Sequence, residues 1–162
     1  MTAFEISDIK QFMSQLLGSS LFDNFLLSEA VIQTNITYQI DGSLQKSFYN
    51  EEQLEELGIA SYAYVPFSMV RNHCFDLIKG KNVPLSFRFV FLLSPENMAN
   101  TIVKSQSSYK PEDISGMFIN LNYRSGKLTC TTGISYKIFS IDKSLEQEWD
   151  ELVEKFLKKH QL

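Results

Sequence analysis

The chain has 162 residues, of which 44% are hydrophobic and 13% aromatic. This length fits one domain or two small halves that share a core, and such an apolar composition excludes intrinsic disorder. The formal net charge of −4 argues against a general attraction to nucleic acid or to anionic membranes.

Cysteine usage and the N-terminal sequence predict a cytosolic protein. The two cysteines, Cys74 and Cys130, are too few for a disulfide framework in a chain that can bury a core. No basic segment followed by an apolar run opens the chain, and no stretch approaches the roughly 18 uninterrupted apolar residues that cross a bilayer. We therefore expect cytoplasmic localisation, two reduced thiols and no membrane association.

The chain begins with a predicted strand at residues 3–6 and an amphipathic helix. Ser7 is the expected N-cap, and apolar residues from Ile9 to Leu17 recur at spacings of three and one before Gly18 ends the helix.

A hairpin is predicted next. Over residues 25–40 the period changes to two, and Asp41-Gly42 is a strong turn signal before a return strand at residues 44–49. In this register Ile40 pairs with Leu44, and Ile36 pairs with Phe48. The elements expected after this hairpin are an acidic helix at 50–57 ended by Gly58, a strand at 59–65, and a helix from Pro66 or Ser68 to Gly80.

The second half predicts a similar series. Its expected elements are a strand at 84–93, a helix at 95–105 capped by Ser94, a strand at 117–123, a turn at Ser125-Gly126, a long strand at 128–141, and a final helix capped by Asp142. Leu145, Trp149 and Leu152 form one stripe of that helix, so Trp149 is expected to anchor it in the core. The sequence thus predicts an α+β fold, with an antiparallel sheet and helices packed on one face.

The order of elements raises the question of an internal duplication. Residues 1–80 and 84–162 both read as a strand, a helix, strands around a turn, and a helix. The arrangement resembles the tandem architectures of the TATA-binding-protein fold and of sliding-clamp domains, although no sequence motif supports this. We expect a single compact domain over residues 1–162, and the alternative of two related halves stays open.

Three stretches carry a family resemblance. They are Leu77–Lys81 with Pro84–Phe87, Gly126–Gly133, and Asp142–Glu146 with Trp149-Asp150. With the layout of the whole chain, they resemble an uncharacterised bacterial family of about this size, classed as a domain of unknown function. The resemblance implies a bacterial cytosolic protein and supplies no activity, ligand or catalytic residue.

Residues suited to catalysis or metal binding are few. His73 and Cys74 are adjacent in a predicted helix and point in different directions, while Cys130 shares the parity of apolar neighbours on its strand. We interpret both cysteines as core residues, and a Cys130–His73 pair remains a disfavoured alternative. With His160 as the only other histidine, no metal-ligand spacing exists, so we expect no metal and no cofactor.

Two charged segments have ordinary structural explanations. Lys79-Gly80-Lys81 could contact a phosphate, but it also fits a helix C-cap flanked by lysines. The acidic run at residues 51–56 suits the solvated face of a short helix.

One polar surface is predicted to be functional. A two-residue turn at Ser125-Gly126 places Arg124 opposite Lys127, Asn122 opposite Thr129 and Asn120 opposite Thr131, all on one side of two strands. Ser135 and Lys137 continue this row, which contains no acid. The first half offers Gln33, Asn35, Thr37 and Gln39 on the analogous face.

The candidate binding residues are therefore Asn120, Asn122, Arg124, Lys127, Thr129, Thr131 and Lys137. The leading hypothesis is a non-catalytic cytosolic binding or interaction module that uses this polar face, with a protein or a nucleic acid as its partner. A nucleic-acid-associated protein is the second hypothesis, and a cysteine-dependent enzyme is a disfavoured third.

Overall fold

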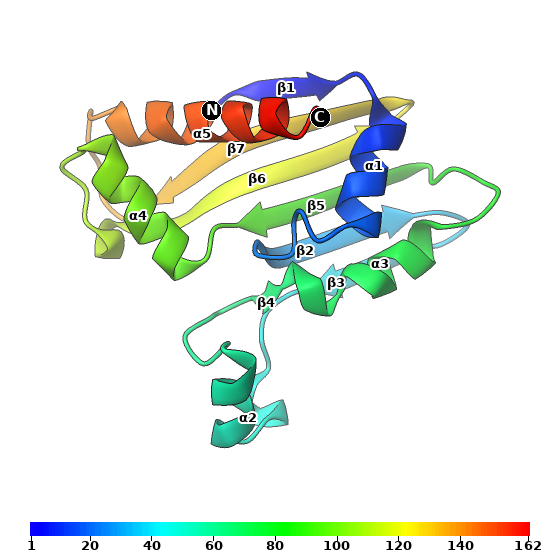
Figure 1. Ribbon diagram of the computed structural model, residues 1–162, viewed down its shortest axis with the longest axis horizontal. Coiled ribbons are helices and arrows are strands. Elements are labelled where there is room, and N and C mark those ends of the chain that lie inside the picture. Colours follow the sequence, from blue (N-terminus) through cyan, green and yellow to red (C-terminus); the bar gives the residue numbers. More distant parts are fainter.

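A computed structural model describes residues 1–162 and contains one antiparallel sheet of seven strands with helices over one face (Figure 1). The strands are β1 (Ala3–Ile6), β2 (Leu26–Gln33), β3 (Thr37–Asp41), β4 (Val65–Pro66), β5 (Ser86–Leu92), β6 (Ile114–Arg124) and β7 (Lys127–Tyr136). The helices are α1 (Ile9–Gly18), α2 (Glu51–Leu57), α3 (Arg71–Ile78), α4 (Pro95–Ser105) and α5 (Ser144–Lys159). The predicted α+β class and antiparallel sheet are confirmed.

The strands follow the order β1-β7-β6-β5-β2-β3, and β4 adds to β2 beside β3. In the second half β5, β6 and β7 are consecutive neighbours, whereas in the first half β1 lies at the far edge, paired with β7 rather than with β2. The two halves therefore do not repeat one pattern of strand pairing, and neither the duplication nor a TATA-binding-protein-like or clamp-like arrangement is shown.

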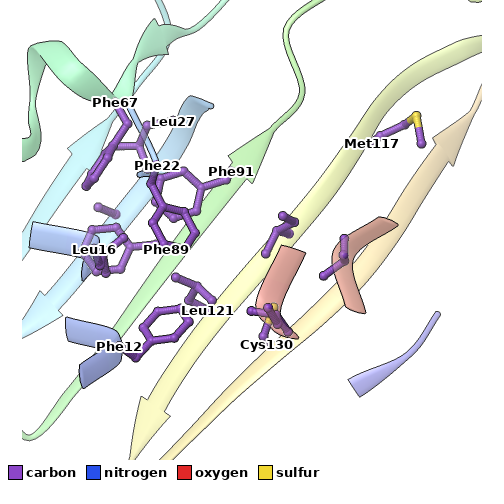
Figure 2. Packing of buried hydrophobic residues seen from close by; sticks show 14 of the residues in the cluster. Phe12, Leu16, Phe22, Leu27, Phe67, Phe89, Phe91, Met117, Leu121 and Cys130 are labelled. Carbon is purple, nitrogen blue, oxygen red and sulfur yellow. The ribbon is translucent and has the colours of Figure 1, made fainter. Parts of the chain in front are cut away.

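The core lies between the sheet and helices α1, α3, α4 and α5, which all contribute to one cluster of 25 buried residues. Alternation along β5 directs Phe87, Phe89 and Phe91 into this layer, where Phe67 and Phe22 pack on Phe91 at ring-centroid distances of 5.0 and 5.6 Å (Figure 2). The prediction that the helices pack on one face of the sheet is thus confirmed for α1, α3, α4 and α5. Helix α2 contributes no residue to this core.

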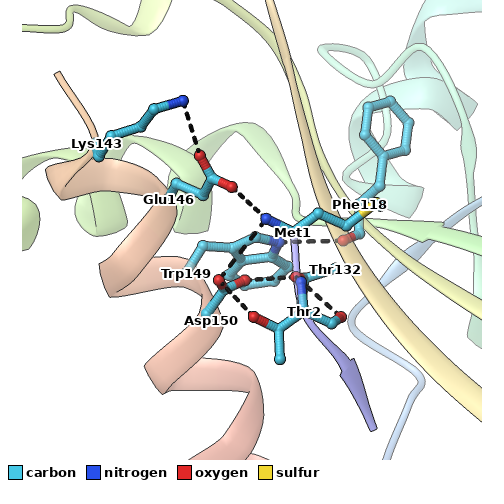
Figure 3. Close-up of polar contacts among 8 residues, drawn as sticks. All are labelled: Met1, Thr2, Phe118, Thr132, Lys143, Glu146, Trp149 and Asp150. Carbon is cyan, nitrogen blue, oxygen red and sulfur yellow. Dashed lines mark hydrogen bonds and ion pairs between the residues drawn. The ribbon is translucent and has the colours of Figure 1, made fainter. Parts of the chain in front are cut away.

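Helix α5 is held by Trp149, which is 3% exposed as predicted. Its indole Nε1–H donates a hydrogen bond of 3.1 Å to the Phe118 carbonyl oxygen of β6 (Figure 3). At the next residue, the Asp150 carboxylate accepts hydrogen bonds from the hydroxyls of Thr2 and of fully buried Thr132. These contacts fix α5 against β6, β7 and the start of β1.

Of the three predicted N-caps, one is at the predicted residue and two are displaced by one residue. Ser94 is the N-cap of α4, as predicted, and accepts a hydrogen bond from the Asn97 N–H. The N-cap of α5 is Lys143 rather than Asp142, whose carboxylate accepts a hydrogen bond from the Ser144 N–H from one residue before the cap. At α1 the capping side chain is Asp8 rather than Ser7, because the Asp8 carboxylate accepts from the Gln11 N–H.

The predicted hairpin at Asp41-Gly42 is wrong. The segment predicted as one strand at 25–40 turns back at residues 34–36, so β2 pairs with β3 in a register that joins Gln33 to Thr37. Ile36 lies in this turn and is exposed, and residues 44–49 form no strand because β3 and β4 already occupy that edge of β2. Phe48, expected to pair with Ile36, is 81% exposed.

Gly42 instead marks a close passage of the chain past β2. Its N–H donates to the Ser28 carbonyl oxygen and its own carbonyl oxygen accepts from the Val65 N–H, both at 2.8 Å. A Cβ at this position would lie 1.7 Å from the Leu27 carbonyl oxygen. Only glycine can therefore occupy this position without moving the backbone.

Residues 43–64, which we call the arm, leave the sheet after β3 and return at β4. A bridge between Ser43 and Tyr64 closes its base, and α2 projects beyond the sheet (Figure 1). The acidic helix is confirmed, with Asn50 in a capping box and Gly58 in the left-handed conformation. The strand predicted at 59–65 is reduced to Val65–Pro66, and α3 begins only at Arg71, after a 3-10 turn.

Replacing Gly42 by alanine should lower the free energy of unfolding by at least about 2–3 kcal/mol, because the new methyl group collides with backbone rather than with a movable side chain. Gly18→Ala is the matched control, since a Cβ there meets nothing within 4 Å, and it should change stability by no more than about 1 kcal/mol. Urea unfolding of both variants measures the difference, and equal stabilities would contradict the close passage.

Truncating Trp149 to alanine should cost about 3–5 kcal/mol, as for other buried tryptophans. Trp149→Phe keeps most of the apolar contact and loses the hydrogen bond to Phe118, so its cost should include only about 0.5–1.5 kcal/mol for that bond. Thermal and urea unfolding give both values. A loss below about 1 kcal/mol for the alanine variant would mean that α5 is peripheral to the core.

Candidate binding face of the sheet

The face of the sheet opposite the helices carries the predicted polar row. The register pairs Arg124 with Lys127, Asn122 with Thr129 and Asn120 with Thr131, as predicted. The intervening residues Leu121, Leu128 and Cys130 are buried in the helix-covered core. The strand parity read from the sequence is therefore correct over this part of β6 and β7.

These polar side chains have no partners within the protein. Asn122, Arg124 and Lys127 are exposed, and Asn120, Thr129 and Thr131 are half-buried. None of the six side chains makes a hydrogen bond or an ion pair with another protein group. Their donors and acceptors are available to water or to a ligand.

Strand β5 extends the row with a residue that the sequence analysis missed. Arg88 pairs with Asn122 across β5 and β6, and its guanidinium forms a 2.9 Å ion pair with Glu29 of β2. The alternation of Phe87, Arg88 and Phe89 already indicates that Arg88 points away from the core. That β5 lies beside β6 could not be read from the sequence, because the pairing joins strands separated by a helix.

A shallow hollow of about 310 Å³ lies at this end of the face. Its lining includes Ser86, Arg88, Asn122 and Arg124, together with Val31 of β2. Two guanidinium groups and an amide at one hollow provide several N–H donors, the combination that suits a carboxylate or another oxyanion.

We call the outward residues of β5, β6 and β7 from Ser86 to Val90, Asn120 to Arg124 and Lys127 to Thr131 the polar face. Adjacent strands bring acids to its margins: Glu5 of β1 pairs with Thr129, and Glu29 of β2 pairs with Val90. The absence of acids noted for β6 and β7 therefore does not extend to the whole sheet. The cationic residues of the polar face, Arg88, Arg124 and Lys127, therefore lie between the carboxylates of Glu5 and Glu29 on the two neighbouring strands.

Two predicted members lie elsewhere. Lys137 follows the last residue of β7 and lies at the opposite end of that strand from Lys127, roughly 30 Å away at the usual rise per residue. Asn35 lies in the β2–β3 turn rather than on a strand. By contrast, Gln33 is in register with Ser86 and Thr37, so the row predicted in the first half does adjoin the polar face.

The other end of the same side of the sheet is apolar. Leu92 has the parity of Arg88 and Val90 yet is buried, and the hypothetical Cβ of Gly116 would touch both Leu92 and the Phe118 ring. Leu26, paired with Leu92, is also buried and pairs with Pro66 where the arm returns to the sheet. The outward charged residues of β5, β6 and β7 are thus confined to the end of the face that carries Arg88, Arg124 and Lys127.

The thiols are placed in the core. Cys74 is fully buried on α3 and Cys130 is 1% exposed on β7, and burial raises the pKa of Cys74 to about 11 and that of Cys130 to about 12. His73 is exposed and makes no hydrogen bond to either sulfur, and the His160 ring packs on Phe156. Neither thiol is activated as a nucleophile requires.

Other charged groups do not assemble into a metal site. No cluster of three or more His, Cys, Asp or Glu residues is arranged to hold a metal ion. Lys79 follows the end of α3, forms a 3.0 Å ion pair with Asp76 and lines a surface hollow with Gly80 and Lys81. None of the helices is both long and apolar enough to span a bilayer.

Residues 15–162 match the family of unknown function DUF5721. The chain belongs to this family. The match includes the whole polar face, and it assigns no activity. No curated protein and no solved structure matches the chain.

We expect both thiols of this DUF5721 protein to react slowly with iodoacetamide near neutral pH in the native state, and two thiols to react rapidly after denaturation. Since the folded state retains thiol protons that the unfolded chain loses near pH 8.5, their contribution to stability is complete below that pH and lost as pH rises to about 11–12. Mass spectrometry of the alkylated protein counts the modified thiols. Rapid labelling of either cysteine in the folded protein would refute this prediction.

Proposed function

We propose that this protein is a non-catalytic binding module of the bacterial cytosol, and that its polar face binds an acidic surface of a partner protein. One observation carries the proposal: six neighbouring polar side chains on β6 and β7, Arg124 among them, point outward with no internal partner, beside the guanidinium group of Arg88.

The chemistry of the face favours recognition of carboxylates. Arg124 and Lys127 are uncompensated cations, and Asn122 lies between Arg88 and Thr129 in the same row. Asn and Thr side chains lose little conformational entropy when they are immobilised, and they both donate and accept hydrogen bonds. Charge-assisted bonds from arginine to a carboxylate would add strength and direction.

The distribution of charge favours a protein over a nucleic acid. A long polyanion crossing the strands would meet Glu5 on one side and Glu29 on the other, in a chain of net charge −4. Single-stranded nucleic acid also needs aromatic side chains for stacking, and half-buried Phe118 is the only aromatic residue with outward parity on β5 to β7. A small acidic patch on a protein can contact the middle of the polar face without reaching Glu5 or Glu29 at its margins.

The proposal is tested with the triple variant Asn122→Thr, Arg124→Thr and Lys127→Thr. Threonine suits a strand, so stability should change by no more than about 0.5 kcal/mol at each position. Proteins captured from a bacterial lysate by the wild type, identified by mass spectrometry, should be lost with this variant. Because the contacts are charge-assisted, capture should also weaken as salt is raised.

The matched control changes Lys10, Lys81 and Asn82 to serine. These three residues are exposed and lie off the sheet. Their substitution removes two positive charges, as the triple face variant does. Wild-type capture is expected for this control. If the triple face variant captures the same partners as the wild type, the polar face is only a solvated surface. If oligonucleotides shift the wild type but not the face variant in a gel assay, the partner is a nucleic acid and the protein-partner proposal fails.

A further inference from the structure

A second concave site lies on the helix side of the sheet, away from the polar face. It is a cavity of about 250 Å³ between α4, α5 and the sheet, which we call the α4–α5 cavity. It opens to solvent along α4, where Asn97, Asn100 and Lys104 are exposed. Its lining comes from two helices that face each other and differ in chemistry.

The α5 wall is apolar and aromatic. Trp149, Leu152, Val153 and Phe156 line it at spacings of three, one and three, which is one face of a helix. The Phe156 ring meets the Phe25 ring edge-on at 5.8 Å, and Ile119 and Leu93 complete the apolar lining. The Trp149 indole N–H is already bonded to Phe118, so its ring offers only apolar surface.

The α4 wall is polar and repeats the same spacing with Asn97, Asn100, Thr101 and Lys104. The Thr101 hydroxyl is satisfied by the Asn97 carbonyl oxygen at 2.8 Å. The Lys104 ammonium and the side-chain amide of Asn100 have no partner within the protein. Lys104 is also the only charged residue in the lining, so the cavity has one uncompensated positive charge and no acid.

We propose that the α4–α5 cavity binds a small amphipathic carboxylate, such as a medium-chain alkanoate. The alkyl chain packs on Trp149, Leu152 and Phe156, while the carboxylate lies at the α4 wall and accepts hydrogen bonds from Lys104 and Asn100. An apolar cavity with a few convergent polar groups is the usual form of a small-molecule site. The lone cation selects the anionic head group, because an ammonium would be repelled and an alcohol would leave Lys104 unpaired.

Trp149 is the only tryptophan of the chain and lines the cavity, so its fluorescence reports occupancy directly. Titration with hexanoate, heptanoate and octanoate should give saturable changes, with the dissociation constant falling about fourfold for each added methylene. Octylammonium should give no saturable change. Lys104→Met should weaken octanoate binding at least tenfold and leave 1-octanol binding unchanged, whereas Lys104→Arg should retain octanoate binding.

Two further variants keep the test interpretable, with folding checked by circular dichroism. Lys155→Met removes an exposed lysine of α5 that is outside the lining and should bind octanoate like the wild type. Asn100→Phe fills the mouth of the cavity from an exposed helix position and should abolish binding without unfolding the protein. Absence of a saturable tryptophan signal with every alkanoate would overturn the proposal. So would equal octanoate affinity in Lys104→Met and the wild type.

Discussion

The row Phe87, Phe89 and Phe91 on β5 is the interaction on which the rest of the fold depends. Strand β5 lies between β6 and β2, so it is the only strand that joins the β1-β7-β6 side of the sheet to the β2-β3 side. The Phe89 and Phe91 rings stack with planes 5° apart, and Phe67 and Phe22 pack on Phe91 from other parts of the chain. Replacing this row with smaller residues would open the core where both sides meet.

The same alternation gives the two faces of the sheet different chemistry. Every second residue of β5, β6 and β7 enters the core, which leaves Arg88, Asn122 and Thr129 aligned across three strands on the other side. The helices then add a separate concave site, because α4 presents a polar stripe to the apolar stripe of α5. The sheet thus supports a flat cationic surface on one side and, with the helices, a solvent-open cavity with one apolar and one polar wall on the other.

The arm leaves and rejoins the sheet near the apolar end of its outward side. Its departure at Gly42 and return at β4 place its base beside Leu26, at the apolar end of the outward side. Gly116 allows Phe118 and Leu92 to pack closely in the same region, since any side chain at residue 116 would displace the Phe118 ring or Leu92. A partner of the polar face would therefore contact mainly the end that carries Arg124 and Lys127.

Local patterns in the sequence determined much of this structure. Parity placed Asn120, Asn122, Arg124, Lys127, Thr129 and Thr131 on one face, because Ser125-Gly126 fixes the register of two adjacent strands. Helical periodicity likewise placed Trp149 and Cys74 in the core, and strand parity placed Cys130 there. The same local reasoning failed at Asp41-Gly42, where a glycine that fits a hairpin turn is needed instead for close contact with Leu27.

Contacts between distant segments were decided only by the tertiary structure. The pairing of β1 with β7 and of β5 with β2 and the joining of Arg88 to the polar face all depend on strand order. The α4–α5 cavity likewise exists only because two helices about 50 residues apart pack side by side. Periodicity specifies which side of an element is buried, but it does not specify which element covers that side, because many apolar surfaces are equally able to do so.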